Sequence, residues 1–192
     1  MIGLIHIWLM LAIGQVSGST PFERGIEAFG RRDFVSAERA LLQAIREQPF
    51  NARAHKFLGM VYSAQERYQS AEEPFRKACS IDPKEESACY YLGRLYYTLN
   101  RYEDSLDIFD NAMSNPNEKG RISYGRAFTQ EALGRNTEAE RDFREAIRIG
   151  EKSALKDYGM FLFRRGRTDE SLETLRKAGA QESFARWAFQ HG

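Results

Sequence analysis

Small and bulky apolar residues recur along the chain from Ser19 onward with a period far longer than one helical turn. One column of small residues is Gly25, Gly59, Gly93, Ala127 and Gly159. A column of bulky residues is Leu41, Phe75, Phe109, Phe143 and Leu175. Two further small columns are Ala37, Ala71, Ser105, Ala139 and Ser171, and Ala44, Ala78, Ala112, Ala146 and Ala178. All four columns step by 34, 34, 34 and then 32 residues, which predicts a repeated structural unit.

Each unit is predicted to contain two helices joined by a polar turn. These turns are Glu66-Arg67, Asn100-Arg101, Gly134-Arg135 and Gly166-Arg167. Pro49 and Pro83 cannot continue a helix interior and mark the ends of two second helices, and Gly150 can end a third in the left-handed conformation. Small columns let paired helices approach closely, and the bulky column fills the space between them. No segment alternates with a period of two, so we expect an all-α fold without a sheet.

The columns carry a recognisable motif in the second and third units. Leu58-Gly59 is followed by Tyr62, Leu92-Gly93 is followed by Tyr96, and Pro83 closes the second unit. This pattern resembles the tetratricopeptide repeat family, whose unit is a 34-residue helix–turn–helix. The resemblance covers residues 19–180 and implies a right-handed α-solenoid of stacked helical pairs. Its expected units are 19–51, 52–85, 86–119, 120–151 and 152–180.

Two units depart from the family pattern. The first unit has Arg24 and Ala28, and the fourth has Arg126 and Gln130, where the pattern calls for Leu and an aromatic residue. Terminal repeats are often atypical because one side faces solvent, which accounts for the first unit. The fourth lies inside the array and is the most divergent.

The first 22 residues contain no Lys, Arg, Asp or Glu. The apolar run Ile2–Val16 is shorter than the roughly 20 residues of a membrane-spanning helix, and small residues follow it. We therefore expect residues 1–18 to be a signal peptide, with a mature chain that starts at Ser19 and is exported to a periplasmic or other extracytoplasmic space, or secreted. No Lys or Arg precedes the apolar run, so two alternatives remain: a retained membrane anchor, or a first apolar helix of the fold.

Residues 181–192 follow the last unit. Phe184, Trp187 and Ala188 lie at positions i, i+3 and i+4 and would form one apolar helical face. We expect a short capping helix over the last repeat, with a frayed tail as the alternative.

The charges and reactive side chains narrow the classes of function. The chain has 28 Lys and Arg against 27 Asp and Glu, and this near balance argues against binding along a nucleic-acid backbone. The sequence holds none of the common metalloprotease, hydrolase or nucleotide-binding motifs. His55 is expected to be structural, and pairs such as Glu72–Arg76 and Glu140–Arg144 should support helix surfaces. We expect no enzyme activity, metal or cofactor.

The two cysteines, Cys79 and Cys89, lie on either side of a turn between helices of adjacent units. Two buried free thiols are one interpretation. If the chain is exported, a disulfide that joins the second unit to the third is the other.

The family resemblance implies that first helices line an inner, concave face, where partners usually bind. The candidate contact residues are Arg53, Lys56, Met60, Tyr90, Arg94, Tyr97, Arg121, Tyr124, Phe128, Lys156, Met160 and Phe163. With Arg164 this face would carry six basic residues, interleaved with aromatic rings, against one acid, Glu131. That combination is typical of interaction hot spots and favours a partner segment with acidic and apolar side chains. Some aromatic residues of the set would alternatively only pack between first helices.

Some family members hold a carboxylate in a Lys/Asn/Arg clamp. Lys56 and Arg121 match two of its positions, but Met60, Tyr91 and Gly125 do not match the others, so the clamp is not expected here. The predicted function is a non-enzymatic protein-interaction scaffold. The alternatives are a membrane-anchored assembly factor with a cytoplasmic repeat domain and, less favoured by charge, a nucleic-acid or polysaccharide binder. The sequence does not define the oligomeric state.

Overall fold

A computed structural model of the chain describes residues 19–83 and 87–180, which form an all-α array. The helices are α1 (Pro21–Gly30), α2 (Phe34–Glu47), α3 (Ala52–Ala64), α4 (Tyr68–Ile81), α5 (Ala88–Thr98), α6 (Tyr102–Ala112), α7 (Lys119–Ala132), α8 (Asn136–Ile149), α9 (Ala154–Arg164) and α10 (Thr168–Lys177). These residues contain no strand, and none of their helices is long and apolar enough to span a bilayer. The expected signal or anchor at 1–18 and the expected cap at 181–192 lie outside the described residues.

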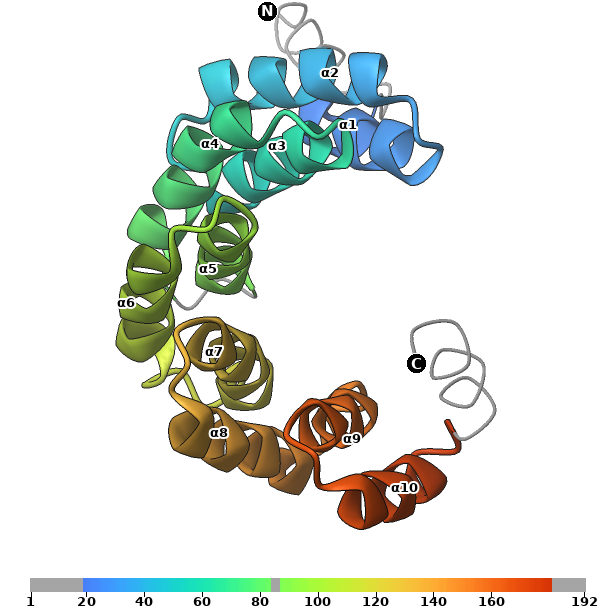
Figure 1. Cartoon of the computed structure of the whole chain (residues 1–192). Coiled ribbons are helices and arrows are strands. Elements are labelled where there is room, and N and C mark those ends of the chain that lie inside the picture. Colours follow the sequence, from blue (N-terminus) through green and yellow to red (C-terminus); the bar gives the residue numbers. More distant parts are fainter. Residues whose placement is uncertain (1–18, 84–86, 181–192) are drawn as a thin grey trace, which may run out of the picture.

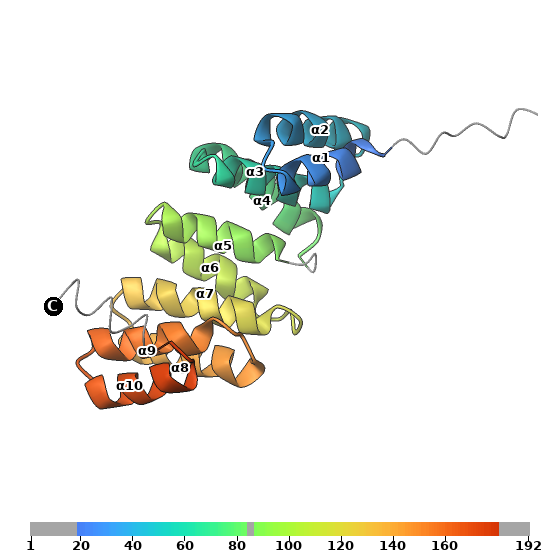
Figure 2. The same ribbon diagram turned by 90° about the vertical axis from the view of Figure 1, so that its right-hand side faces the viewer.

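The ten helices form a C-shaped arc with two concentric layers (Figure 1). The odd-numbered helices α1, α3, α5, α7 and α9 line the inside, and the even-numbered helices cover the outside (Figure 1). Figure 2 looks into the open side of the arc and shows the inner helices stacked in chain order. The predicted all-α solenoid of helical pairs is therefore confirmed.

The small and bulky columns meet within each helical pair. A Cβ placed on Gly59 would lie 2.6 Å from the Phe75 ring, and one placed on Gly93 would lie 2.6 Å from Phe109. Glycine is needed at these positions because the ring of the second helix occupies the space of a side chain on the first. Phe109 is fully buried and is also touched from the next unit by Gly125, whose Cβ would lie 2.6 Å from its ring. The inner helices α5 and α7 thus share one ring as their spacer.

The turns between paired helices repeat one backbone conformation. A residue with φ between 58° and 75° occurs once in each turn, at Arg32, Glu66, Asn100, Gly134 and Gly166. This left-handed residue reverses the chain so that the second helix runs back along the first. Gly150 at the end of α8 also has a positive φ of 97°, as predicted.

Arginines begin four of the outer helices and tie neighbouring units together. Arg67, Arg101, Arg135 and Arg167 occupy the N-cap positions of α4, α6, α8 and α10 without a side-chain capping bond. All four instead bind a glutamate on the preceding outer helix: Arg67 with Glu38 at 2.8 Å, Arg101 with Glu72 at 3.0 Å, Arg135 with Glu103 at 3.4 Å, and Arg167 with Glu140 at 2.8 Å.

A tyrosine completes three of these four ties. The hydroxyls of Tyr62, Tyr96 and Tyr158 donate to Glu38, Glu72 and Glu140 at 3.1, 3.1 and 2.9 Å. Glu72 is therefore engaged between units, and Arg76 pairs with Glu73 instead of the expected Glu72. The expected Glu140–Arg144 pair is present at 2.6 Å.

Candidate functional site

A hollow on the inner face, between α5 and α7, brings together six of the twelve sequence-predicted contact residues. Its volume is about 590 Å³, within the range of small ligand sites. The six are Tyr90, Arg94, Tyr97, Arg121, Tyr124 and Phe128. We call this the α5–α7 hollow.

Tyr90 forms the floor of the α5–α7 hollow and is only 8% exposed. The guanidinium carbons of Arg94 and Arg121 lie 5.6 and 5.4 Å from the centroid of its ring. Burial raises the pKa of the Tyr90 hydroxyl, and the two arginine charges oppose that rise. The ring stays neutral near pH 7, and its π-face can hold both cations.

Aromatic rings from both helices form a wall of the hollow. The ring centroids of Tyr97 and Phe128 are 6.4 Å apart, and those of Tyr124 and Phe128 are 5.2 Å apart with a T-shaped arrangement. The Tyr124 hydroxyl donates to Asp157 on α9, and burial together with this bond raises the pKa of Tyr124. Phe128 also packs on the buried Phe143, so the wall is anchored in the core.

A polar contact at the start of α5 and α7 fixes Arg121. The Arg121 guanidinium donates to the hydroxyl of Ser87, and that hydroxyl donates to Glu118 at 3.2 Å. Glu118 also lies 3.9 Å from Arg121. Ser87 and Glu118 are both buried, so Arg121 is held in place before any ligand arrives. The sequence prediction omitted Glu118 because it precedes α7, whereas the first candidate residue of that helix is Arg121.

A second hollow of about 300 Å³ lies between α3 and α5. We call it the α3–α5 hollow; Met60 lines it together with Phe75 and Leu95. Tyr91, Arg94 and Thr98 line both hollows. These three residues lie at i, i+3 and i+7 of α5 and form the ridge between the hollows.

The remaining predicted contacts lie elsewhere. Arg53 and Lys156 are exposed and line neither hollow. Met160 and Phe163 pack against Leu175 at the C-terminal end of the array, so they contribute to the core of the last helical pair.

The expectation that Lys56 is an exposed contact is wrong. It is 8% exposed, and its ammonium group lies 5.7 Å from the ring centroid of Phe57 on the same helix. The long side chain therefore folds along α3 with its stem covered. Tyr90 is likewise buried instead of exposed, although as the floor of the α5–α7 hollow it keeps one accessible face.

The inner face is also less basic than expected. Glu131 binds Arg164 through two bonds of 2.8 and 2.7 Å, which neutralises that arginine. Asp157 and Glu151 join Glu131 there, since Asp157 binds Tyr124 and Glu151 lines the α5–α7 hollow. The sequence prediction included Glu131 alone, because it considered only one stripe along each inner helix. It therefore omitted Asp157 and Glu151.

Cys79 at the end of α4 and Cys89 at the start of α5 are joined by a disulfide. The sequence left two interpretations open, free thiols or a disulfide. The structure has the disulfide, which joins the second and third helical pairs. Cys89 immediately precedes Tyr90, so the disulfide lies next to the floor of the α5–α7 hollow.

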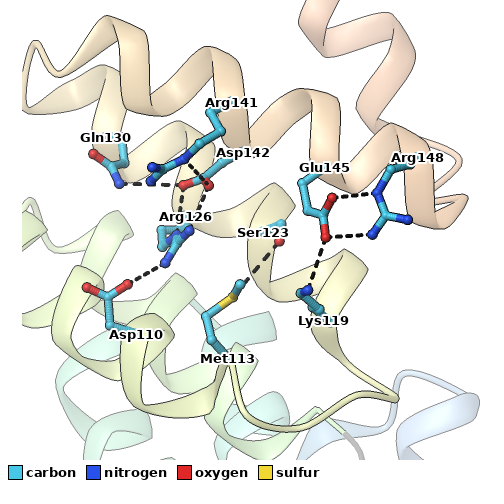
Figure 3. A network of polar contacts seen from close by, with 10 residues as sticks. All are labelled: Asp110, Met113, Lys119, Ser123, Arg126, Gln130, Arg141, Asp142, Glu145 and Arg148. Carbon is cyan, nitrogen blue, oxygen red and sulfur yellow. Dashed lines mark hydrogen bonds and ion pairs between the residues drawn. The ribbon is translucent and has the colours of Figure 1, made fainter.

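The divergent fourth unit contains a buried polar network in place of the Tyr–Glu–Arg tie. Arg126 lies between Asp142 and Asp110, at 2.7 Å from each Asp142 oxygen and 2.6 Å from Asp110 (Figure 3). The amide of Gln130 also points at Asp142, at 3.5 Å. Asp142 is 2% exposed, and its charge is tolerated because Arg126 compensates it. The two residues that depart from the family pattern, Arg126 and Gln130, thus share one partner.

The described residues show no cluster of side chains suited to holding a metal ion. Within residues 19–83 and 87–180, no group of three or more His, Cys, Asp or Glu side chains converges on a metal-sized site. A ring nitrogen of His55 lies 2.9 Å from the carbonyl oxygen of Pro49, in the turn before its own helix. The contacts at His55 are those of a structural residue.

These features define a helical repeat protein with a hollowed inner face. The sequence model of the tetratricopeptide repeat family matches residues 22–86 and 124–183, more than half of the chain. The chain therefore belongs to the tetratricopeptide repeat family. The comparison with curated proteins found no match.

Solved structures share the fold at low sequence identity. MamA is 21% identical with a TM-score of 0.69, over 84% of this chain and 96% of MamA. PilF of Pseudomonas aeruginosa is 18% identical with a TM-score of 0.74, over 84% of this chain and 74% of PilF. YrrB, described as a TPR protein with an unusual peptide-binding site, is 19% identical with a TM-score of 0.64, over 82% of both chains.

Proposed function

We propose that this chain is a non-enzymatic scaffold that binds a segment of a partner protein on its concave inner face, with the α5–α7 hollow as the main contact. The family supports a protein-interaction role in general. The observation that carries the proposal is the α5–α7 hollow, where two arginines and five aromatic rings from two inner helices converge on a space of about 590 Å³. Arginine and tyrosine are enriched among the few residues that contribute most of the binding energy at protein interfaces.

The hollow is pre-formed, which favours binding. Ser87 and Glu118 hold Arg121, Asp157 holds Tyr124, and Phe143 supports Phe128. Side chains already fixed by neighbours lose little rotamer freedom when a ligand binds, so more of the contact energy appears as affinity.

We further propose that the chain is exported and acts in a cell envelope or outside the cell, with residues 1–18 as a cleaved signal. The disulfide supports this, since disulfides persist in oxidising compartments. A membrane-anchored protein with the same inner face is the alternative. Sequencing the N-terminus of the protein isolated from its own cells separates the two: Ser19 supports export, and Met1 supports the anchor.

Site-specific photocrosslinking tests the binding face. A photoreactive phenylalanine analogue is placed at Tyr97 or Met60 on the inner face, and at Lys77 or Asp107, exposed positions on the outer helices. We expect adducts with the same partner from the inner positions and not from the outer ones. Adducts from the outer positions alone, or from none of the four, would contradict the proposal.

A charge reversal gives an independent test. Arg94→Glu should abolish capture of the crosslinked partner while the helical circular dichroism signal stays unchanged, because Arg94 is exposed on the ridge of α5. The same change at Lys56 is unsuitable, since a buried position would report on folding as well as on binding. Unchanged capture by Arg94→Glu would contradict a role for this face.

A further inference from the structure

We infer that the bound segment crosses α5 as a helix, with a carboxylate on Arg94 and one apolar side chain in each of the two hollows beside that helix. The inference rests on the proposed function, because it assumes that the inner face binds a protein segment. It adds the chemistry and the spacing of that segment.

The ridge residues set the arrangement. Arg94 lies between Tyr91 and Thr98 on one face of α5, and all three line both the α3–α5 and the α5–α7 hollows. A ligand that fills both hollows must therefore pass over Arg94. The two hollows are parts of one bipartite site, and the side chain of Arg94 lies between them.

Arg94 is the cation available at this site. Among the described residues it forms no ion pair, and its guanidinium rests against the ring of Tyr90. Arg121 is engaged by Ser87, and Arg164 is engaged by Glu131. A cation that is exposed on one side and backed by a buried ring on the other favours an anionic ligand group, and a carboxylate can accept two of its N–H donors.

The surfaces on either side of the ridge favour apolar side chains. Met60, Phe75 and Leu95 contribute to the α3–α5 hollow. Tyr97, Tyr124 and Phe128 form the aromatic wall of the α5–α7 hollow, which is about twice as large and is also lined by Arg121 and Glu151. We therefore expect an aliphatic side chain in the smaller hollow and an aromatic one in the larger.

The spacing of the hollows selects the conformation of the ligand. Neighbouring helices pack about 8–10 Å apart, so the spaces on the two sides of α5 are separated by roughly 10 Å. In an α-helix, residues i and i+7 lie on one face about 10.5 Å apart, with i+4 between them on the same face. An extended strand spans about 13 Å between i and i+4, and a polyproline helix turns its intermediate residues away from the face. A helical segment with apolar residues at i and i+7 and an acid at i+4 meets all three requirements.

A library of helical peptides tests this arrangement. Fourteen-residue peptides in an alanine- and glutamine-rich host without other acidic or aromatic residues, randomised at positions 3, 7 and 10, are displayed on phage and selected on the immobilised full chain. We expect enrichment of Asp or Glu at position 7 and of apolar residues at positions 3 and 10. Selection on Arg94→Gln should keep the apolar preferences and lose the acidic one.

The most enriched peptide is then synthesised with a fluorescent label, and its affinity is measured by anisotropy. Arg94→Gln should weaken binding about tenfold, and the matching amide at peptide position 7 should weaken it to a similar degree. The two losses should not multiply when combined, because they remove one contact. Arg94→Lys should retain only part of the affinity, because lysine keeps the charge but not the two-donor geometry. Arg76→Gln, a change on the outer helix α4, should have no effect.

Three results would overturn the inference: no enriched peptide, enrichment without an acid, or an acid preference that survives Arg94→Gln. If inner-face photocrosslinks persist in any of these cases, the scaffold function stands and only the ligand arrangement is wrong. If the crosslinks are absent as well, the proposed function fails with it.

Discussion

Replacing Gly125 with alanine tests the close contact between units three and four. The added Cβ would lie 2.6 Å from one atom of the Phe109 ring and 3.0 Å from a second. Phe109 cannot move away easily, because Gly93 touches the same ring from α5 at 2.6 Å. The fourth unit differs, since Ala127 occupies the column of Gly93 there and packs beside another ring, that of Phe143.

The magnitude follows from two opposed effects. Overpacking a filled core is unfavourable by roughly 1–3 kcal/mol, while replacing a helical glycine with alanine is favourable by about 0.5–1 kcal/mol. The steric effect is the larger at Gly125, so we expect Gly125→Ala to lower the free energy of unfolding by about 1–2 kcal/mol. Gly30→Ala is the matched control, since a Cβ there meets no atom within 4 Å. It should have no unfavourable effect and should gain up to about 1 kcal/mol.

Urea unfolding followed by circular dichroism measures both variants. Phe109→Leu should reduce the penalty of Gly125→Ala in a double-mutant cycle, because the smaller side chain relieves the clash. Equal stabilisation by Gly125→Ala and Gly30→Ala would refute the idea that Phe109 is a fixed spacer between α5 and α7.

Three further predictions concern ionic and covalent contacts. Asp142→Asn should destabilise the protein by roughly 3 kcal/mol in urea unfolding, since it removes the buried partner of Arg126 and leaves only the exposed Asp110. Glu73→Gln, which breaks an exposed pair, should change stability by less than about 1 kcal/mol, and similar losses would contradict the distinction. Cys79→Ser with Cys89→Ser should lower stability by about 2–3 kcal/mol for a loop of this length, and dithiothreitol should lower the wild type, but not the variant, to that level. Hydrogen bonds from Arg148 and Lys119 lower the pKa of Glu145 from 4.5 to about 2. Its contribution to folding stability is therefore complete above pH 4.5 and is lost as the pH falls towards 2. The difference in urea midpoint between the wild type and Glu145→Gln should shrink over that range, and a difference independent of pH would contradict the assignment.

The sequence was sufficient for the repeat architecture because the periodic positions are the ones that touch. Gly59 and Phe75 are in register with the other columns and are in contact in the fold. Gly150 is also where the sequence predicted a left-handed helix end. Both features depend on local geometry, and the contact between the small and bulky columns is repeated from unit to unit.

The site was only partly predictable because it depends on contacts between units. Glu118 lies outside the periodic columns, and its role arises only when the start of α7 comes beside Ser87. The departures at Arg126 and Gln130 were visible in the sequence, but their shared partner Asp142 was not, because it lies on another helix. The burial of Lys56 likewise follows from how its long side chain folds along α3.

The disulfide changes how the array would respond to force applied at its two ends. In a repeat array, adjacent units can separate one after another because each contacts only its neighbours. The bond between Cys79 and Cys89 keeps the junction of the second and third units closed, and the chain between these residues carries no tension. Ten residue steps at about 3.5 Å each are then replaced by the 4.7 Å between the two cysteine Cα atoms in the contour of the stretched chain. The fully extended oxidised protein is therefore about 30 Å shorter than the reduced one.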